Sequence, residues 1–180
     1  MWEFQKLMLE DIRIAKKQAL KMPTPFALRT LIRTATAYIE GTVYQLRLVC
    51  LAALKDAPNY FSPEEAVVLQ EKYVTIDNKG NIKEKDDFQK ILPSILFTFS
   101  LFAKLHNIGF KPEISDHRWD SLKKLFEIRN ALMHPKIQSD FEISQQKNQW
   151  CFEGLAWFQE NLKTLYRACE KADMESKSKG

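Results

Sequence analysis

The chain has 180 residues, of which 45% are hydrophobic and 28% charged, and its formal net charge is +4. This length suits one domain, and the apolar fraction can build a buried core while the charged residues keep the surface solvated. The presence of only five glycines favours a helical fold. The mildly basic charge permits an anionic partner without requiring one.

The cysteines argue against a disulfide framework and against a zinc site. Cys50, Cys151 and Cys169 are odd in number and widely spaced, and no pair has the CxxC spacing. We therefore expect reduced core thiols of a cytoplasmic protein. Neither His106 nor His117 falls at ligand spacing from a cysteine, so we expect no metal and no cofactor.

The sequence also argues against a membrane protein. Charged residues follow the first methionine too early for a signal peptide. The apolar run at residues 91–103 is interrupted by proline, serine and threonine and is too short to span a bilayer. We expect no membrane contact and a buried helix over this run.

Hydrophobic residues recur at helical spacing through the first third of the chain. Residues 1–21 predict an amphipathic helix, residues 22–25 break it, and residues 26–56 predict a long helix with one continuous apolar face. Gly41, in the middle of that helix, costs roughly 1 kcal/mol against alanine. A second helix packed close to Gly41 would explain this glycine.

A polar strip flanks the apolar face of the long helix. It consists of Arg29, Arg33, Thr36, Glu40, Tyr44 and Arg47. One interpretation is a solvated surface. The other is a basic, hydroxyl-bearing strip that contacts phosphates, with Arg29, Arg33 and Arg47 as the binding cations.

Turn residues and capping signals mark a short helix and a hairpin next. Residues 58–61 predict a turn, and Ser62 with Glu65 forms a capping-box pattern that starts a helix extending to about residue 72. Residues 73–76 and 81–83 predict two strands around a turn at residues 77–80. Because an isolated hairpin is marginally stable, we expect a small insertion near residues 73–83 in a helical domain.

Three further helices are predicted. The first begins at Asp86 or Asp87 and extends to about His106, with a kink at Pro93. The second begins at residue 115 or 116 and ends at His134, because Pro135 disfavours a helical residue before it. The last begins at residue 140 or 144. We expect an all-α fold of about five to six helices, with one domain over residues 1–173 and a polar tail at 174–180.

One cation interrupts the apolar face of the helix that precedes Pro135. The stripe consists of Trp119, Leu122, Leu125, Phe126, Leu132 and Met133. Arg129 projects from the middle of this stripe. An unpaired buried guanidinium is very costly, so Arg129 must either find a partner, for which Glu40 is available, or open onto a cleft.

Two further polar residues follow Arg129. Asn130 and His134 are four residues apart and share one side of the helix. Arg129 and His134 are separated by about 140° on an ideal helix, so they converge only if the last turn opens, which Pro135 favours. A helix C-terminus favours a cation, which suits His134 to proton transfer near neutral pH, and Arg129 presents a fork of donors to a phosphate.

This combination suits the cleavage of RNA by its own 2′-hydroxyl. The nucleophile belongs to the substrate, so the protein must only move protons and stabilise the charged transition state. The segment Arg129-Asn130-x-x-x-His134 closes a helix of the form Trp-x-x-Leu-x-x-Leu-Phe-x-Ile-Arg-Asn. In both features it resembles the HEPN superfamily, whose motif is an arginine followed after about four to six residues by a histidine.

The resemblance implies a small helical bundle that forms a symmetric homodimer with the two motifs facing each other. It implies a metal-independent endoribonuclease acting in a toxin, phage-defence or RNA-processing role, with Arg129 and His134 as the catalytic pair and Asn130 in support. Glu40, and Tyr44 behind it, are the candidates for a supporting residue from another helix. The partners it implies are RNA and a neutralising antitoxin or a nucleotidyltransferase.

Two other interpretations remain open. Members of the superfamily with the motif intact also include modules that bind RNA or nucleotides without cutting, or that only dimerise. An Arg–His pair at a helix end can also serve structure alone, by capping carbonyls and forming a salt bridge. His106 and His117 have no matching partners in the sequence and are interpreted as incidental.

Overall fold

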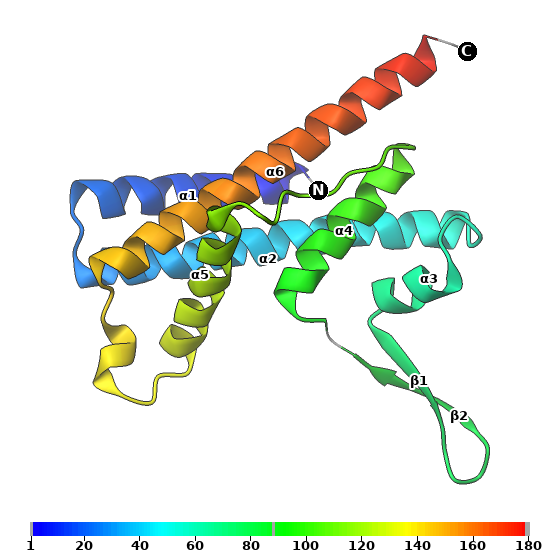
Figure 1. Ribbon diagram of the computed structural model, residues 1–180, viewed down its shortest axis with the longest axis horizontal. Coiled ribbons are helices and arrows are strands. Elements are labelled where there is room, and N and C mark those ends of the chain that lie inside the picture. Colours follow the sequence, from blue (N-terminus) through cyan, green and yellow to red (C-terminus); the bar gives the residue numbers. More distant parts are fainter. Residues whose placement is uncertain (1, 88, 179–180) are drawn as a thin grey trace. The chain divides into compact units, whose positions relative to one another are not determined.

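The computed structural model describes residues 2–87 and 89–178, and of Trp2 it describes only the backbone. The described elements follow one another as α1 (Trp2–Lys21), α2 (Pro25–Asp56), α3 (Pro63–Leu69), β1 (Lys72–Ile76), β2 (Ile82–Asp86), α4 (Ile91–Leu105), α5 (His117–Met133), the 3-10 turn η1 (Gln138–Phe141) and α6 (Gln145–Lys177) (Figure 1). The expected all-α fold with a small hairpin is confirmed. None of the described helices combines the length and apolar character needed to cross a bilayer.

The chain forms two compact units. One consists of residues 1–42 and 112–166, and the other of residues 43–111 and 167–180. Helices α2 and α6 each contribute a part to both units.

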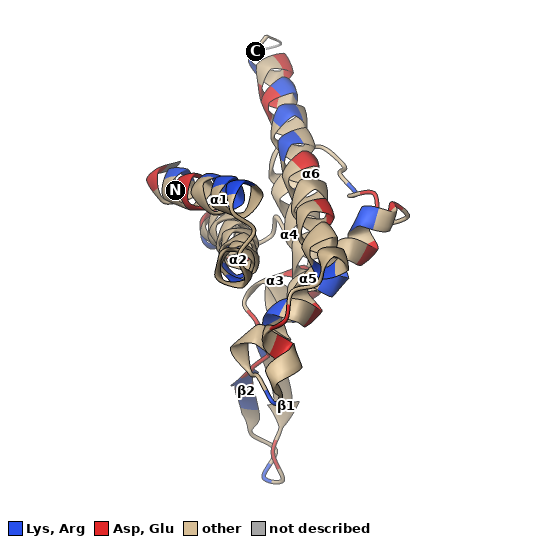
Figure 2. Cartoon of the chain, turned by 90° about the vertical axis from the view of Figure 1, so that its left-hand side faces the viewer, with Lys and Arg blue, Asp and Glu red and all other residues tan. Residues whose placement is uncertain are grey.

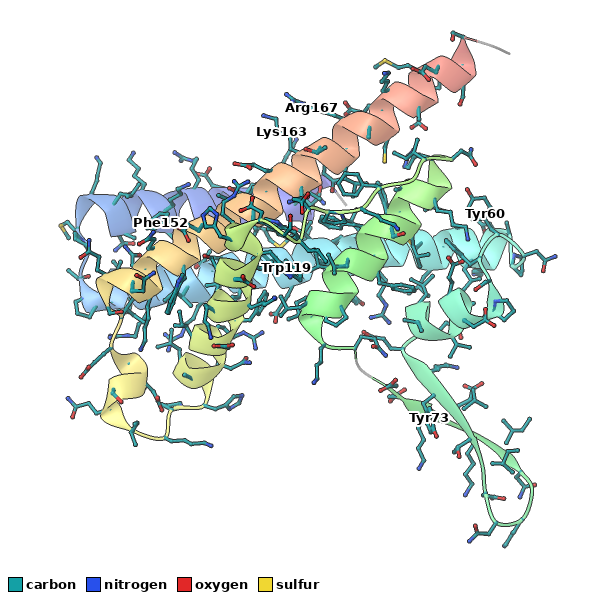
Figure 3. All side chains as sticks on the ribbon, viewed as in Figure 1. Tyr60, Tyr73, Trp119, Phe152, Lys163 and Arg167 are labelled. Carbon is teal, nitrogen blue, oxygen red and sulfur yellow. The ribbon has the colours of Figure 1, made fainter. Side chains whose placement is uncertain are left out.

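The first unit contains α1, the first part of α2, α5 and most of α6. Helix α1 lies alongside α2 (Figure 1), as the short link between them requires. Leu31 of α2, Leu125 of α5 and Phe158 of α6 are completely buried. Trp119 of α5, labelled in Figure 3, packs on Trp157 of α6 with ring centroids 4.7 Å apart. The apolar stripes of three helices therefore meet in one core, as their helical spacing predicted.

The second unit contains α3, the hairpin, α4 and the ends of α2 and α6. The capping box is present, because the Ser62 hydroxyl accepts from the Glu65 backbone N–H and the Glu65 carboxylate accepts from that of Ser62. At the other end of α3, Arg47 donates from Nε to the carbonyl oxygen of Leu69 at 2.8 Å and pairs with Glu71. Both ends of this short helix are thus held by side chains.

The hairpin differs from its expected form. It extends away from α3 and α4 (Figure 1), and Tyr73 on β1 is exposed (Figure 3). Strand β2 continues to Asp86 because Lys72 pairs with Asp86 in the register. The expected helix start at Asp86 or Asp87 is therefore wrong, and α4 begins at Ile91. Pro93 consequently lies in the first turn of α4, where proline is tolerated, and not in a helix interior.

Helix α6 continues to Lys177, through much of the stretch 174–180 that we expected to be a polar tail. The residues of that stretch that the structure describes are exposed. Residues 179 and 180 lie outside the described residues.

Helices α5 and α6 approach each other at Gly154. A β-carbon on Gly154 would stand 2.7 Å from the Cα of Leu122 and 2.8 Å from its backbone nitrogen. A β-carbon on Gly41 would instead stand 2.5 Å from Sδ of Met8, a flexible side chain of α1. Helix α1 therefore packs over Gly41 as expected, but only Gly154 is confined by backbone atoms.

We expect Gly154→Ala to lower the free energy of unfolding by about 1–3 kcal/mol, because the α5 backbone has to move. Gly41→Ala should be nearly neutral, because the end of Met8 can shift and alanine gains about 1 kcal/mol of helix propensity. Urea unfolding of both variants beside the parent protein measures the difference. Equal destabilisation by the two substitutions would contradict the close contact at Gly154.

The three thiols are free and buried, as expected. Burial raises the pKa of Cys50 and of Cys151 to about 12, and that of Cys169 to about 11. The thiol pKa values are higher in the folded than in the unfolded protein, so the neutral thiols contribute their full stabilisation below about pH 8.5, the ordinary thiol pKa. This contribution to the free energy of unfolding is lost as the pH rises through the thiol pKa values of the folded protein.

At pH 8 the folded chain should react with Ellman's reagent far more slowly than the chain in 6 M guanidinium, because the thiolate is the reactive form. The free energy of unfolding should also fall between about pH 8.5 and 12. Absorbance at 412 nm and denaturant titrations at several pH values measure these two effects. Fast reaction of all three native thiols would contradict their burial.

Candidate functional site

The candidate site forms where α5 ends. Asp116 caps the start of the helix by accepting from the backbone N–H of Arg118 at 2.9 Å. The helix ends at Met133, and His134 leaves the helical path with φ −129° and ψ 59° while its N–H still donates to the Asn130 carbonyl. Pro135 accounts for this end, because the residue before a proline is disfavoured in the α conformation.

Arg129, which interrupts the apolar stripe of α5, forms an ion pair with Glu40. Its Nη2 pairs with the carboxylate of Glu40 on α2, and its Nη1 donates to Oδ1 of Asn130 at 2.9 Å. The two side chains of the ion pair keep 26% and 36% of their surface exposed. The pair is therefore accessible from solvent, and Asn130 fixes the orientation of the guanidinium.

Arg129 and His134 both line one open pocket of about 370 Å³. The other lining residues are Arg33, Thr36, Ala37, Glu40 and Met133. With His134 neutral, two arginines and one glutamate give the lining a net charge of +1. An anionic group of about the size of a phosphate is the ligand that this charge favours.

His134 is exposed and makes no side-chain hydrogen bond or ion pair with any residue that the structure describes. Its imidazole is therefore available to a ligand. It lies at the C-terminal end of α5, where the helix dipole favours a cation. We expected the last turn of α5 to open so that Arg129 and His134 converge. Their presence in the lining of the same pocket agrees with that expectation.

The flanking residues of α2 have separate roles. Nη2 of Arg33 lies 3.5 Å from the carbonyl oxygen of Leu132, at the limit of a hydrogen bond, so its guanidinium sits over the last turn of α5. The Thr36 hydroxyl is buried and donates to carbonyls within its own helix, at 3.1 Å. Met133, which we expected in the buried stripe, is 53% exposed because it borders the pocket.

Other candidates lie elsewhere. Tyr44 and Arg47 belong to the second compact unit and are not among the described residues that line the pocket. Tyr44 is exposed, whereas Arg47 is largely buried in its contacts with Leu69 and Glu71. Of the arginines predicted on α2, Arg33 therefore lines the pocket with the motif.

The remaining histidines each contact a carboxylate away from the pocket lining. His106 contacts Asp173 at 2.9 Å, and His117 contacts Asp116 at 3.2 Å. Among residues 2–87 and 89–178, no group of three or more histidine, cysteine, aspartate or glutamate side chains is arranged to hold a metal ion.

Sequence reasoning missed the turn η1 that follows the motif. Arg29 donates from Nη1 to the carbonyl oxygen of Phe141 at 3.3 Å, and its guanidinium lies 5.8 Å from the centroid of the Phe141 ring. The sequence predicts Asp140 only as a possible helix start. It instead accepts from the backbone N–H groups of Lys136 and Ile137. These hydrogen bonds hold the pKa of the Asp140 carboxyl below its usual value.

Basic and acidic residues are mixed along two of the helices. Figure 2 shows lysine and arginine positions interspersed with aspartate and glutamate positions along α6, and both kinds on α1.

Comparison with known proteins gives no further assignment: no family model, no curated protein and no solved structure matches this chain.

The ion pair can be measured by a double-mutant cycle with Glu40→Gln, Arg129→Gln and the double variant. Because both side chains are partly exposed, we expect a coupling energy of only about 0.5–1 kcal/mol in unfolding experiments, decreasing with added salt. The matched control is the pair Glu10–Arg13 on α1, which is more exposed and should couple more weakly. A coupling of several kcal/mol would instead indicate a sealed, purely structural pair.

Proposed function

We propose that the chain is a metal-independent endoribonuclease that cleaves RNA through attack of the 2′-hydroxyl on the neighbouring phosphate. The observation that carries the proposal is that Arg129 and His134 line one open pocket together with Arg33. The resemblance of Arg129-Asn130-x-x-x-His134 to the HEPN motif supports the same chemistry. On that resemblance we further propose a cytoplasmic homodimer in a toxin, phage-defence or RNA-processing role, with an antitoxin or a nucleotidyltransferase as partner.

In this reaction the 2′-oxygen forms a bond to phosphorus and the bond to the 5′-oxygen breaks. The products are a 2′,3′-cyclic phosphate and a free 5′-hydroxyl. One proton leaves the 2′-hydroxyl and one is added to the 5′-oxygen, so no co-reactant is needed. In a homodimer with facing motifs, the two copies of His134 divide these two transfers. Arg129 and Arg33 stabilise the negative charge that grows on the phosphate oxygens.

Glu40 has a defined part in this proposal. It holds Arg129 at the pocket in the absence of RNA through the ion pair with Nη2, while Nη1 donates to Asn130. An incoming phosphate then shares the guanidinium or displaces Glu40. Asn130 continues to orient Nη1 in either state.

A second candidate function is an RNA- or nucleotide-binding or dimerisation module without cleavage. The observation that favours it is the ion pair itself, because Arg129 is already paired within the chain. In this case Arg33 and Arg29 would supply most of the phosphate contacts, and loss of His134 would hardly change binding.

Incubation of the purified protein with RNA in EDTA should give products with 2′,3′-cyclic phosphate ends. Both Arg129→Ala and His134→Ala should reduce the rate by at least about 10²-fold, because each removes transition-state stabilisation or proton transfer. His117→Ala is the matched control. His117 is an exposed histidine at the other end of the same helix, and the rate should be unchanged.

Circular dichroism and thermal melting of each variant confirm that the fold survives. Absence of cleavage by the folded parent protein would reject the nuclease. Salt-dependent RNA binding that survives His134→Ala would then favour the binding module.

A further inference from the structure

An exposed aromatic ring follows the motif. Phe141, at the end of η1, is 40% exposed. The guanidinium of Arg29 lies over its ring at 5.8 Å from the centroid and also donates to its carbonyl oxygen. The ring is therefore anchored to α2 by a cation–π contact and a hydrogen bond, although much of its surface remains in water.

The turn that presents Phe141 is ordered by polar contacts. Oδ2 of Asp140 accepts from the backbone N–H of Lys136 at 2.7 Å and from that of Ile137 at 3.1 Å. These hydrogen bonds hold the turn that carries Phe141 in a defined conformation. The ring keeps 40% of its surface exposed, so part of it is open to a stacking partner.

The ring is adjacent to the cationic pocket. Arg29 and Arg33 are four residues apart on α2, so they share one face and are separated by about one helical turn, roughly 6 Å. Arg29 contacts Phe141, and Arg33 lines the pocket with His134. An aromatic surface and a phosphate-sized pocket therefore follow each other along the same helix.

We infer that Phe141, backed by Arg29, is a stacking subsite for a nucleobase of single-stranded RNA whose phosphate occupies the pocket. The inference rests on the proposed function for the identity of the ligand. Aromatic side chains beside cations are the usual means of binding single strands, because every base has a face to stack. A base inside a duplex is already stacked and paired, so the subsite selects unpaired segments.

The test uses the full chain carrying His134→Ala, so that RNA is bound but not cut. The probe is a short single-stranded RNA with 2-aminopurine at one position, whose fluorescence is quenched when the base stacks. Phe141→Leu in this background keeps an apolar side chain but removes the ring. It should weaken binding about tenfold, within the range for one lost base stack, and should abolish quenching at one position of the RNA.

Two controls separate stacking from disturbance of the fold. Phe141→Trp keeps an aromatic face and should restore both affinity and quenching. Tyr73→Leu removes an exposed aromatic ring from the hairpin and should change neither. A duplex RNA of the same sequence should bind equally well with Phe or Leu at position 141.

Unchanged single-strand affinity and quenching in Phe141→Leu would overturn the subsite, as would a loss produced by Tyr73→Leu instead. Equal loss of single-strand and duplex binding would also overturn it, since it would indicate a general contact or a disturbed turn. Cleavage by the parent protein is measured separately. Cleavage with no effect of Phe141→Leu therefore rejects the subsite alone, whereas ring-dependent quenching without cleavage rejects the nuclease alone.

Discussion

The ion pair between Arg129 and Glu40 joins the last turns of α5 to the middle of α2. The apolar stripe of α5 has to be buried for the first unit to have a core, and this burial carries a guanidinium toward α2. A carboxylate at position 40 meets the electrostatic requirement without filling the space around it. Both members of the pair line the pocket, and their side chains remain partly exposed in it.

The end of α5 places the remaining groups. Pro135 stops the helix, so His134 departs from helical geometry and turns toward the face that carries Arg129. The chain then needs a compact turn before α6, and Asp140 supplies it by accepting two backbone N–H groups. Phe141 is positioned by that turn. Pro135 therefore sets the departure of His134 from the helix, while Asp140 and Arg29 together position the aromatic ring.

The sequence was most informative where a pattern is local. Helical spacing located the long helices, and the Ser62–Glu65 capping box located α3. It failed at the start of α4, because β2 reads Ile-Lys-Glu-Lys-Asp, is exposed throughout, and has no apolar alternation to indicate a strand. Glu40 was found as a partner because the misplaced Arg129 required a nearby acid. Arg47 was predicted together with Arg33 because they share a helical face, but Arg47 belongs to the second unit, where it contacts Leu69 and Glu71. Phe141 could not be predicted, since its partner Arg29 is 112 residues away in the sequence.

The structural and functional interpretations of Arg129 are compatible in energy. If the partly exposed pair contributes about 0.5–1 kcal/mol, an incoming phosphate that displaces Glu40 loses only about two- to fivefold in affinity. A second arginine in the same pocket, Arg33, can offset a loss of that size. The pair is therefore too weak to block an anion and strong enough to keep the guanidinium oriented when the pocket is empty. Stabilisation of the fold by Arg129 thus does not count against the proposed role in binding phosphate, and in that proposal His134 decides whether binding leads to cleavage.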